Sequence, residues 1–276
     1  MAKKDKGEVV LGTQGFSFDD WVGPFYPKGT PKKSYLEAYA NRFPAVEIDS
    51  TFYGTPRPTT IQGWKERTPD EFRFAAKFPR LITHDKKLEG AGGDAEAFVG
   101  SMQVLGDKLA VLTLQFAYDF KPESFDRLDK FLGKLPPGPR YAVEVRNREW
   151  LNTDLGEMLS QHNVALVLQD LHYMPKLDWV TTDFTVIRWL GRRKDIEQFD
   201  RIQIDRSEVL AEWAEKVRIF LNSGIDVFGF FNNHFAGHSP ESVRQFAEML
   251  GIDLTTTDNH VVSSSQMDMG FDEPTR

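Results

Sequence analysis

Two acidic side chains, Glu47 and Asp49, have a spacing that places them together. They alternate with the apolar residues Val46 and Ile48, and successive side chains of a β-strand point to opposite faces. One face of this predicted strand is therefore apolar, and the other carries two carboxylates. The aromatic pair Phe52–Tyr53 follows before the next turn. Packing alone explains such a segment poorly, so we interpret it as one wall of a polar pocket.

The same change from apolar to polar side chains recurs where most of the other predicted strands end. One such strand end is uninformative, whereas a set of them predicts a common site if the ends meet. Besides Glu47, Asp49 and Tyr53, the side chains at or just after these ends are Thr13, Gln14, Lys77, His84, Gln115, Glu144, Arg146, Asp170, Arg188, Asn232 and Asn233.

Acid–base chemistry on a small anionic substrate, phosphorylated or sugar-like, is the first chemistry that this set supports. Glu47 and a second carboxylate, Glu144 or Asp170, would act as acid and base, with Lys77 as a further catalytic group. Arginine and lysine side chains bind anions through charge-assisted hydrogen bonds. The predicted substrate-binding residues are Gln14, Tyr53, His84, Gln115, Arg146, Arg188, Asn232 and Asn233. A hydrolase, a lyase and an isomerase are all compatible with this scheme.

A divalent metal with a bound water is the second chemistry. Glu47, Glu144, Asp170 and His84 are the side chains that would bind it. The sequence contains no HExxH motif or similarly close spacing of ligands, so we rank this scheme below the first. The sequence requires no cofactor.

A binding module without catalysis is the third possibility. In this scheme aromatic side chains stack on sugars or bases while basic groups hold phosphate. Barrel enzymes often bind phosphate after strands seven and eight, and segments 191–193 and 237–239 have suitable composition for that role. The aromatic side chains concerned are Trp21, Phe25, Tyr26, Tyr53, Trp150 and Trp189.

Each of these residues also has a purely structural interpretation. Glu144 and Arg146 can form an ion pair, and Glu47 can be a buried carboxylate that Arg146 or Lys77 neutralises. A histidine in a loop, such as His84, is more often a hydrogen-bonding residue than a catalyst. Nothing near Lys77 requires a Schiff base, and Asn232–Asn233 can satisfy loop backbone. The basic segment Arg192–Lys194 can be a solvated loop.

The elements that must position these side chains alternate between strands and helices. Helices begin at Thr30–Pro31, at Thr59 or Thr60 and at Asp94, and further helices span 122–132, 153–162, 207–223 and 239–250. Segment 171–183 reads as a loop. This order predicts an α/β protein with a (β/α)8 TIM-type barrel, and a doubly wound open sheet is the alternative. The strands are expected at 9–13, 46–49, 72–77, 109–116, 141–146, 164–169, 184–189 and 226–233.

Composition sets the outer limits of these predictions. A length of 276 residues suits one barrel, expected over residues 9–252, with a flexible N-terminus (1–8) and a polar, mobile tail (253–276). The net charge of −7 disfavours nucleic acid as a partner without excluding a local basic patch. With no cysteine, thiol chemistry is excluded. No signal peptide or membrane span is evident, so we expect a cytoplasmic protein. The oligomeric state is not predicted.

Several motifs together resemble the DUF72 (YecE-like) family of bacterial and archaeal proteins, over about residues 9–250. The resemblance implies a TIM-type barrel with a polar pocket at the strand ends, and it implies no particular reaction. The motifs are Gly12–Phe16, Phe25–Pro27, Val46–Tyr53, Phe72–Lys77, Ile82–His84, Glu144–Arg146, Trp150, Asp170, Arg188 and Phe231–Asn233.

This chain departs from the pattern of that family at four positions. Gln14 and Phe16 stand where Ser and Trp are common, and Asp49 stands where Asn is common. Leu190 replaces the histidine of an Arg-x-His-Gly motif. Any function that the family assigns to that histidine does not transfer to this chain.

Overall fold

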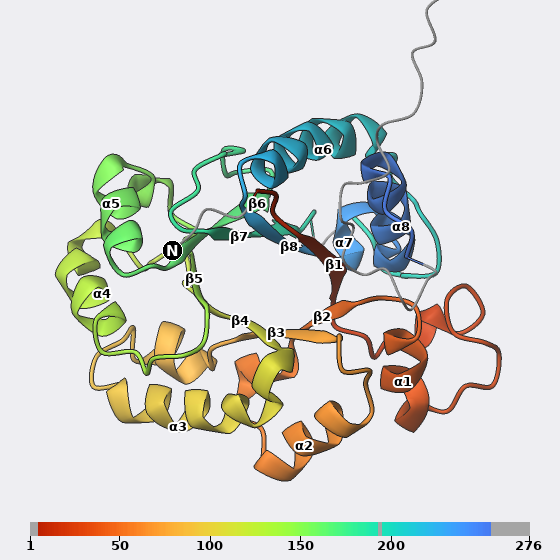
Figure 1. Ribbon diagram of the computed structural model, residues 1–276, viewed down its shortest axis with the longest axis horizontal. Helices are drawn as coiled ribbons and strands as arrows, with labels where there is room; N and C mark the ends of the chain where they lie inside the picture. The colour runs from red at the N-terminus through yellow and green to blue at the C-terminus, as the bar shows by residue number, and fades with distance from the viewer. Residues whose placement is uncertain (1–4, 193–194, 255–276) are drawn as a thin grey trace, which may run out of the picture.

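The computed structural model describes residues 5–192 and 195–254. Eight parallel strands pair in chain order and close into a barrel (Figure 1). The predicted (β/α)8 TIM-type barrel is therefore confirmed, and the open sheet is excluded. The strands are β1 (Val9–Gln14), β2 (Ala45–Ile48), β3 (Arg73–Lys77), β4 (Leu109–Gln115), β5 (Tyr141–Glu144), β6 (Ala165–Asp170), β7 (Phe184–Trp189) and β8 (Asp226–Phe231).

Two separate cores follow from the alternation of side chains along these strands. Small and branched residues such as Ala45, Ala142 and Val167 pack inside the barrel. Larger apolar residues, including Leu166 and Leu168, face outward and pack against the surrounding helices. Because both faces are covered, the strands read as nearly continuous apolar runs.

Figure 1 shows the longer helices as an outer ring around the strands. Their apolar stripes face the barrel; in the helix after β7, for example, Leu210, Trp213 and Val217 are buried. Figure 1 also places the short helix α7 (Asn233–Ala236) beside β1 and β8. The α-helices are α1 (Tyr35–Ala40), α2 (Pro58–Glu66), α3 (Gly92–Met102), α4 (Phe125–Leu132), α5 (Thr153–Gln161), α6 (Ser207–Asn222), α7 (Asn233–Ala236) and α8 (Ser239–Leu250).

Several predicted boundaries were wrong. The first helix does not begin at Thr30–Pro31, because Thr30 Oγ1 donates to the carbonyl of Pro27 and a 3-10 turn at Lys32–Ser34 precedes α1. The loop containing His84 is a π-helical turn, Leu81–Asp85. Strand β5 ends at Glu144, so Arg146 lies beyond the strand. As expected, residues 171–183 contain no helix.

The two ends of the chain extend outside the described residues. Of the N-terminal segment expected to be flexible, residues 1–4 lie outside the described part. The amide of Gly7 donates to the carbonyl of Leu221, and the amide of Glu8 donates to Asp226. Most of the expected tail, residues 255–276, also lies outside it. Within the described ranges, no helix is both long and apolar enough to cross a membrane.

Candidate functional site

A cavity of about 930 Å³ opens where the carboxyl ends of the strands meet. We call it the mouth cavity. Most of the predicted site residues line it, although they come from distant parts of the chain. Those that do are Gln14, Tyr53, Lys77, His84, Gln115, Arg146, Arg188 and Asn232.

Beneath this cavity lies a buried network of four side chains, Gln14, Glu47, Glu144 and Arg188, which we call the floor network. Arg188 donates from Nε and Nη2 to Glu47 Oε2 at 3.2 and 2.9 Å. Its Nη1 donates to Glu144 Oε2, and its Nη2 also reaches Gln14 Oε1 at 3.1 Å. Gln14 Oε1 accepts a further hydrogen bond from Asn232 Nδ2 at 3.0 Å. One guanidinium group therefore holds two carboxylates from opposite parts of the barrel wall.

Strand register explains why these side chains converge. Gln14 is level with Glu47 across the β1–β2 pair, and Arg188 is level with Gln169 across β6–β7. Glu144 is level with Gln115 across β4–β5. Each of these side chains points into the barrel, at the carboxyl end of a strand whose other inward-facing residues are mostly apolar. Closure of the sheet then brings the polar tips together.

The two buried glutamates respond differently to the same arginine. Burial raises the pKa of Glu47, and the opposing effects of Arg188 and Lys77 are too small to reverse the shift. Burial also acts to raise the pKa of Glu144, but Arg146 and Arg188 together outweigh it and lower that pKa. Glu144 is therefore the stable carboxylate, and Glu47 is the group that more readily takes up a proton. For Arg188, burial is outweighed by Glu144 and Glu47, which raise its pKa.

Several polar atoms around the floor network have no hydrogen-bond partner within the described chain. They are Glu47 Oε1, Thr113 Oγ1, Arg146 Nε and Gln169 Oε1. Arg146 Nη2 forms an ion pair with Glu144 Oε1, although this contact lacks hydrogen-bond geometry. Leaving a buried polar group unpaired costs about 1–3 kcal/mol. Such a concentration of unpaired groups is typical of a site that a ligand completes.

A second pair of charges lies at the side of the cavity. Lys77 Nζ contacts Asp49 Oδ1 at 2.9 Å and lies 5.6 Å from the centroid of the Phe52 ring. Asp49 was recognised with Glu47 as an acidic pair but was not assigned a function. The structure makes it the counter-ion of Lys77, so Lys77 does not neutralise Glu47 directly.

Aromatic and histidine side chains form the rim of the mouth cavity. Phe52, Tyr53 and His84 lie on one side, and His172 and Tyr173 follow β6 on another. Burial and the neighbouring Arg80 lower the pKa of His84, which favours its neutral form. The sequence reasoning missed His172, Tyr173 and also His234 of α7, although each follows a strand that it had identified.

Asp170 and Asn233 are not brought into the mouth cavity. Asp170 faces outward from β6, where its Oδ2 accepts a hydrogen bond from Trp213 Nε1 at 2.9 Å and lies 3.7 Å from Lys176 Nζ. Asn233 is buried and accepts hydrogen bonds from Trp21 Nε1 and from Ser239. Both side chains join neighbouring elements of the fold.

The ligand set of the second, lower-ranked scheme is not brought together, because Asp170 points away from Glu47 and Glu144 to Trp213. Across residues 5–192 and 195–254, no group of three or more His, Asp or Glu side chains is arranged to hold a metal ion.

The stacking surface predicted in the third scheme does not form as expected. Among its aromatic members only Tyr53 is exposed, and the others are buried in the core. The phosphate site expected before α8 is closed, since Ser239 is buried and its amide is used by Asn233. Arg192 lines the mouth cavity, while residues 193–194 lie outside the described chain. The buried aromatic residues are Trp21, Phe25, Tyr26, Trp150 and Trp189.

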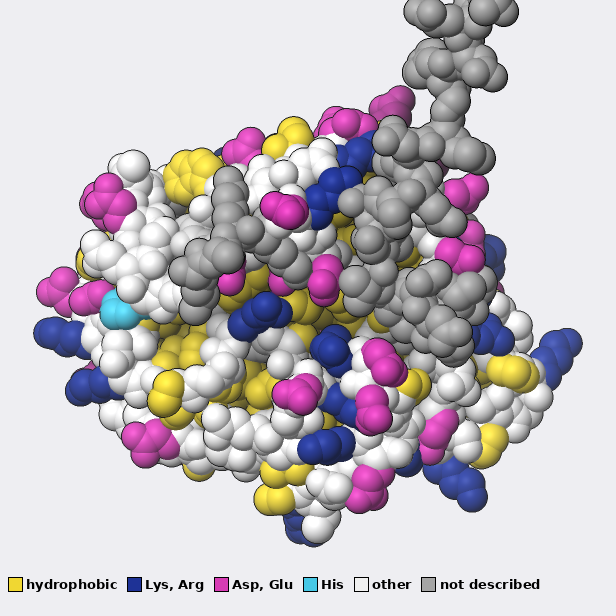
Figure 2. Space-filling model, viewed as in Figure 1, with side chains coloured by type: hydrophobic (Ala, Val, Ile, Leu, Met, Phe, Trp, Pro, Cys, Tyr) yellow, Lys and Arg dark blue, Asp and Glu magenta, His cyan; other side chains and the backbone are white. Residues whose placement is uncertain are grey.

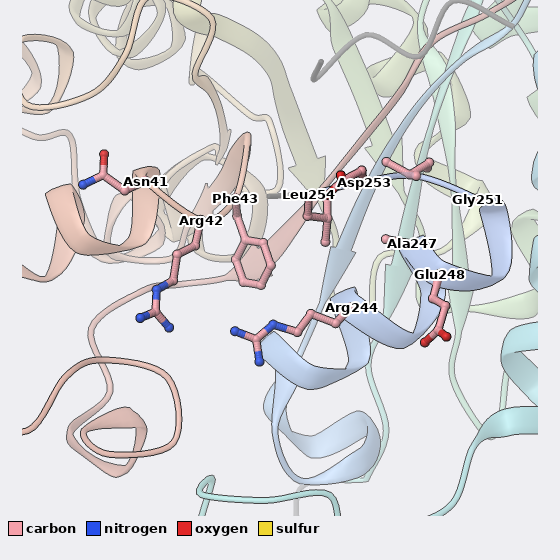
Figure 3. Close-up of a pocket in the computed structure, with 10 residues that line it drawn as sticks. Asn41, Arg42, Phe43, Arg244, Ala247, Glu248, Gly251, Asp253 and Leu254 are labelled. Atoms are coloured by element: carbon pink, nitrogen blue, oxygen red, sulfur yellow. The ribbon is translucent and has the colours of Figure 1, made fainter. Parts of the chain in front are cut away.

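A second cavity of about 660 Å³ lies between the end of α1 and α8. Figure 3 shows Arg244 extending from α8 toward Arg42. Arg42 and Phe43 precede β2, so this cavity lies toward the amino ends of the strands and away from the floor network. Both arginines lie over the ring of the buried Phe25, an arrangement that packing explains without a ligand.

Comparison with known proteins gives a consistent picture. Residues 10–266 match the family model described as "Protein of unknown function DUF72". The chain is 34% identical over 140 residues to the UPF0759 protein YecE of Escherichia coli, a match that covers 49% of this chain and only 52% of YecE. It is 24% identical to the UPF0759 protein YunF of Bacillus subtilis over 90% of this chain and 96% of YunF.

Solved structures agree in fold. A DUF72 family protein from Thermotoga maritima superposes with a TM-score of 0.76 at 29% identity, covering 88% of this chain and 99% of the other. A DUF72 family protein from Enterococcus faecalis gives a TM-score of 0.73 at 22% identity, covering 90% and 100% of the two chains.

Proposed function

This chain belongs to the DUF72 family, and on that premise we propose that it is an enzyme that performs acid–base chemistry on a small anionic molecule, phosphorylated or sugar-like, bound in the mouth cavity. The observation that carries the proposal is the opposite direction of the pKa shifts of Glu47 and Glu144. Environments that push the pKa values of two neighbouring carboxyl groups apart are how a site separates its acid from its base.

Anion binding is assigned to Lys77, Arg146 and Arg188, which all line the cavity. Arg146 offers the best-defined contact, because its buried Nε has no partner within the described residues. Glu144 keeps both arginines in position through its two oxygens. An arginine that is already oriented loses little entropy when it binds an oxyanion bidentately.

Proton exchange is assigned to Glu47. Its Oε2 is held by Arg188, whereas its Oε1 has no hydrogen-bond partner among the described residues. A general acid or base is most effective when its pKa lies near the working pH. Raising the pKa of a carboxyl group moves it in that direction. Lys77, fixed by Asp49 at the cavity side, is the second proton-carrying group of the set.

The proposal is tested by turnover of a panel of phosphorylated and sugar-like anions by the wild-type protein and two variants. Glu47→Gln keeps the shape of the side chain and removes its titration, so turnover should fall by a factor of about 100 or more, the usual contribution of one general acid or base. The matched control Asp170→Asn should leave turnover unchanged, because Asp170 lies outside the cavity. Full activity of folded Glu47→Gln would refute the acid–base assignment.

A non-catalytic nucleotide- or nucleic-acid-binding module is the second candidate, favoured by the aromatic rim of the mouth cavity. Charge opposes a long nucleic acid partner. Figure 2 shows Lys and Arg side chains interspersed with Asp and Glu on the face drawn, and the net charge of the whole chain is −7. Binding to DNA or RNA that weakens steeply with salt, without turnover of any anion, would favour this module.

A further inference from the structure

The rim of the mouth cavity contains an aromatic side chain that the fold does not use. Tyr53 is 84% exposed, although it ends a 3-10 turn, Ser50–Tyr53, that comes just after the fully buried strand β2. It lines the mouth cavity with Phe52 and His84, and the ring of Phe52 packs edge-on against both of its neighbours. What distinguishes Tyr53 is its place at the edge of a polar cavity, because aromatic side chains commonly line ligand pockets.

The cationic groups of the same cavity lie next to this aromatic rim. Lys77 lies over the Phe52 ring, so the first cation assigned to anion binding adjoins the ring cluster. Arg146 follows β5, which lies three strands around the closed barrel from β2, the strand that precedes Tyr53. Arg146 and Tyr53 nevertheless line the same cavity. A ligand whose anionic group meets Lys77 and Arg146 can therefore extend toward Tyr53.

A ring on the ligand has few other favourable places in this cavity. The floor network is polar and charged, and apolar surface is supplied mainly by the rim, from Phe52, Tyr53 and Tyr173 together with Leu171 and Leu190. Stacking of a planar ring on an aromatic side chain contributes about 1–3 kcal/mol.

We propose that the substrate of the mouth cavity is an aromatic anion, of the class of nucleoside monophosphates and aryl phosphates, whose planar ring stacks on Tyr53 while its anionic group binds Lys77 and Arg146. This inference rests on the proposed function, because it takes the anion site from it and adds the ring. It also distinguishes this ligand class from a simple sugar phosphate, which offers no planar ring.

The test compares the affinities of phenyl phosphate and methyl phosphate, which differ only in the ring, by isothermal titration calorimetry, with adenosine 5′-monophosphate as a larger probe. The wild-type protein should bind phenyl phosphate and adenosine 5′-monophosphate at least about 5-fold more tightly than methyl phosphate, the lower end of what one stacked ring contributes. Tyr53→Ala should abolish this preference, and Tyr53→Phe should retain it.

Tyr118→Ala is the matched control. Tyr118 is 65% exposed and lines a neighbouring cavity that shares Tyr173, but neither Phe52 nor Tyr53, with the mouth cavity, so its removal should leave the preference for the ring unchanged. Arg146→Gln should weaken phenyl and methyl phosphate alike, because both carry the anionic group.

The outcomes separate the two proposals. Equal affinity for phenyl and methyl phosphate in the wild-type protein would overturn the ring assignment and leave the anion site standing. A ring preference that survives Tyr53→Ala would place the ring elsewhere and also overturn it. If neither phosphate binds, the anion site fails, and the ring assignment fails with it.

Discussion

Two cations are buried among the described residues, and they lie at opposite ends of the barrel. Lys108 precedes β4 at the amino end and is 6% exposed. Arg188 lies near the carboxyl end of β7, points into the barrel and is 2% exposed. Lys108 Nζ donates to the carbonyls of Lys65 and Thr68, both at 2.7 Å. Arg188 instead contacts the carboxylates of Glu47 and Glu144.

The two buried cations differ in whether the polar groups around them are all paired. We use this difference to distinguish a charge buried for stability from one buried at a functional site. The acceptors of Lys108 are carbonyls at the end of α2 and just beyond it, and its nearest carboxylate, Asp70, is 3.6 Å away at the surface. Around Arg188, by contrast, Glu47 Oε1 and Arg146 Nε remain without a partner in the described chain. A fold gains nothing from unpaired buried groups, so those around Arg188 favour the carboxyl end of the barrel as the candidate site.

Replacing Arg188 by Met should have the largest effect. It leaves two buried carboxylates with only the charges of Arg146 and Lys77 nearby, and removal of one partner from a buried ion pair typically costs about 3–5 kcal/mol. Urea denaturation at neutral pH measures the loss in free energy of unfolding. A loss below about 1 kcal/mol would show that the floor network is better hydrated than its burial indicates.

Replacing Lys108 by Met should have a smaller effect of a different kind. The aliphatic part of the side chain is kept, and the acceptors left unpaired cost about 1–3 kcal/mol. Because Lys108 is remote from the mouth cavity, the affinity for inorganic phosphate, measured by calorimetry, should equal that of the wild-type protein. A change in that affinity would contradict the assignment of Lys108 to a purely structural role at the amino end of the barrel.

The pH dependence of stability should distinguish Glu47 from Glu144. Because the pKa of Glu47 is raised in the fold above its ordinary value of 4.5, its contribution is present at low pH and is lost as the pH rises through the raised pKa, with a slope of at most about 1.4 kcal/mol per pH unit. The lowered pKa of Glu144 has the opposite sign, so its contribution is lost only on acidification below 4.5.

Urea denaturation across pH 4.5–8 measures this difference. Glu47→Gln should remove a fall in stability with rising pH that the wild-type protein shows. Glu144→Gln serves as the control and should keep that fall. An identical pH profile for wild type and Glu47→Gln would mean that Glu47 titrates normally.

The smallest effect concerns His84 at the rim. Burial, followed by the charge of Arg80, lowers its pKa below the ordinary 6.5. Arg80→Gln should therefore raise the pKa of His84 toward that value, as followed by the NMR shifts of its ring. Arg67→Gln, a substitution just after α2 and away from the cavity, should leave the titration unchanged. A similar shift in both variants would exclude a local effect of Arg80.

Much of the site was predictable because its signals are local. Gln14, Lys77, Gln115, Arg146 and Arg188 were identified as polar ends of apolar strands, and all of them line the mouth cavity. The position of Asp170 was not predictable in this way. In a strand buried on both faces, apolar residues occupy inward and outward positions alike, so the sequence does not reveal which of Gln169 and Asp170 faces the barrel.

The order of strands and helices, the class of fold and the polar side chains at the strand ends could be predicted from the chain, since each depends on periodicity within a few residues. The folded protein was needed to show that Arg188 joins Glu47 to Glu144, that Asp170 points to Trp213, and that Tyr53 alone of the predicted stacking residues is exposed. These arrangements depend on closure of the barrel and on loop packing, which bring together residues 43 to 141 positions apart, so no local pattern in the chain reveals them.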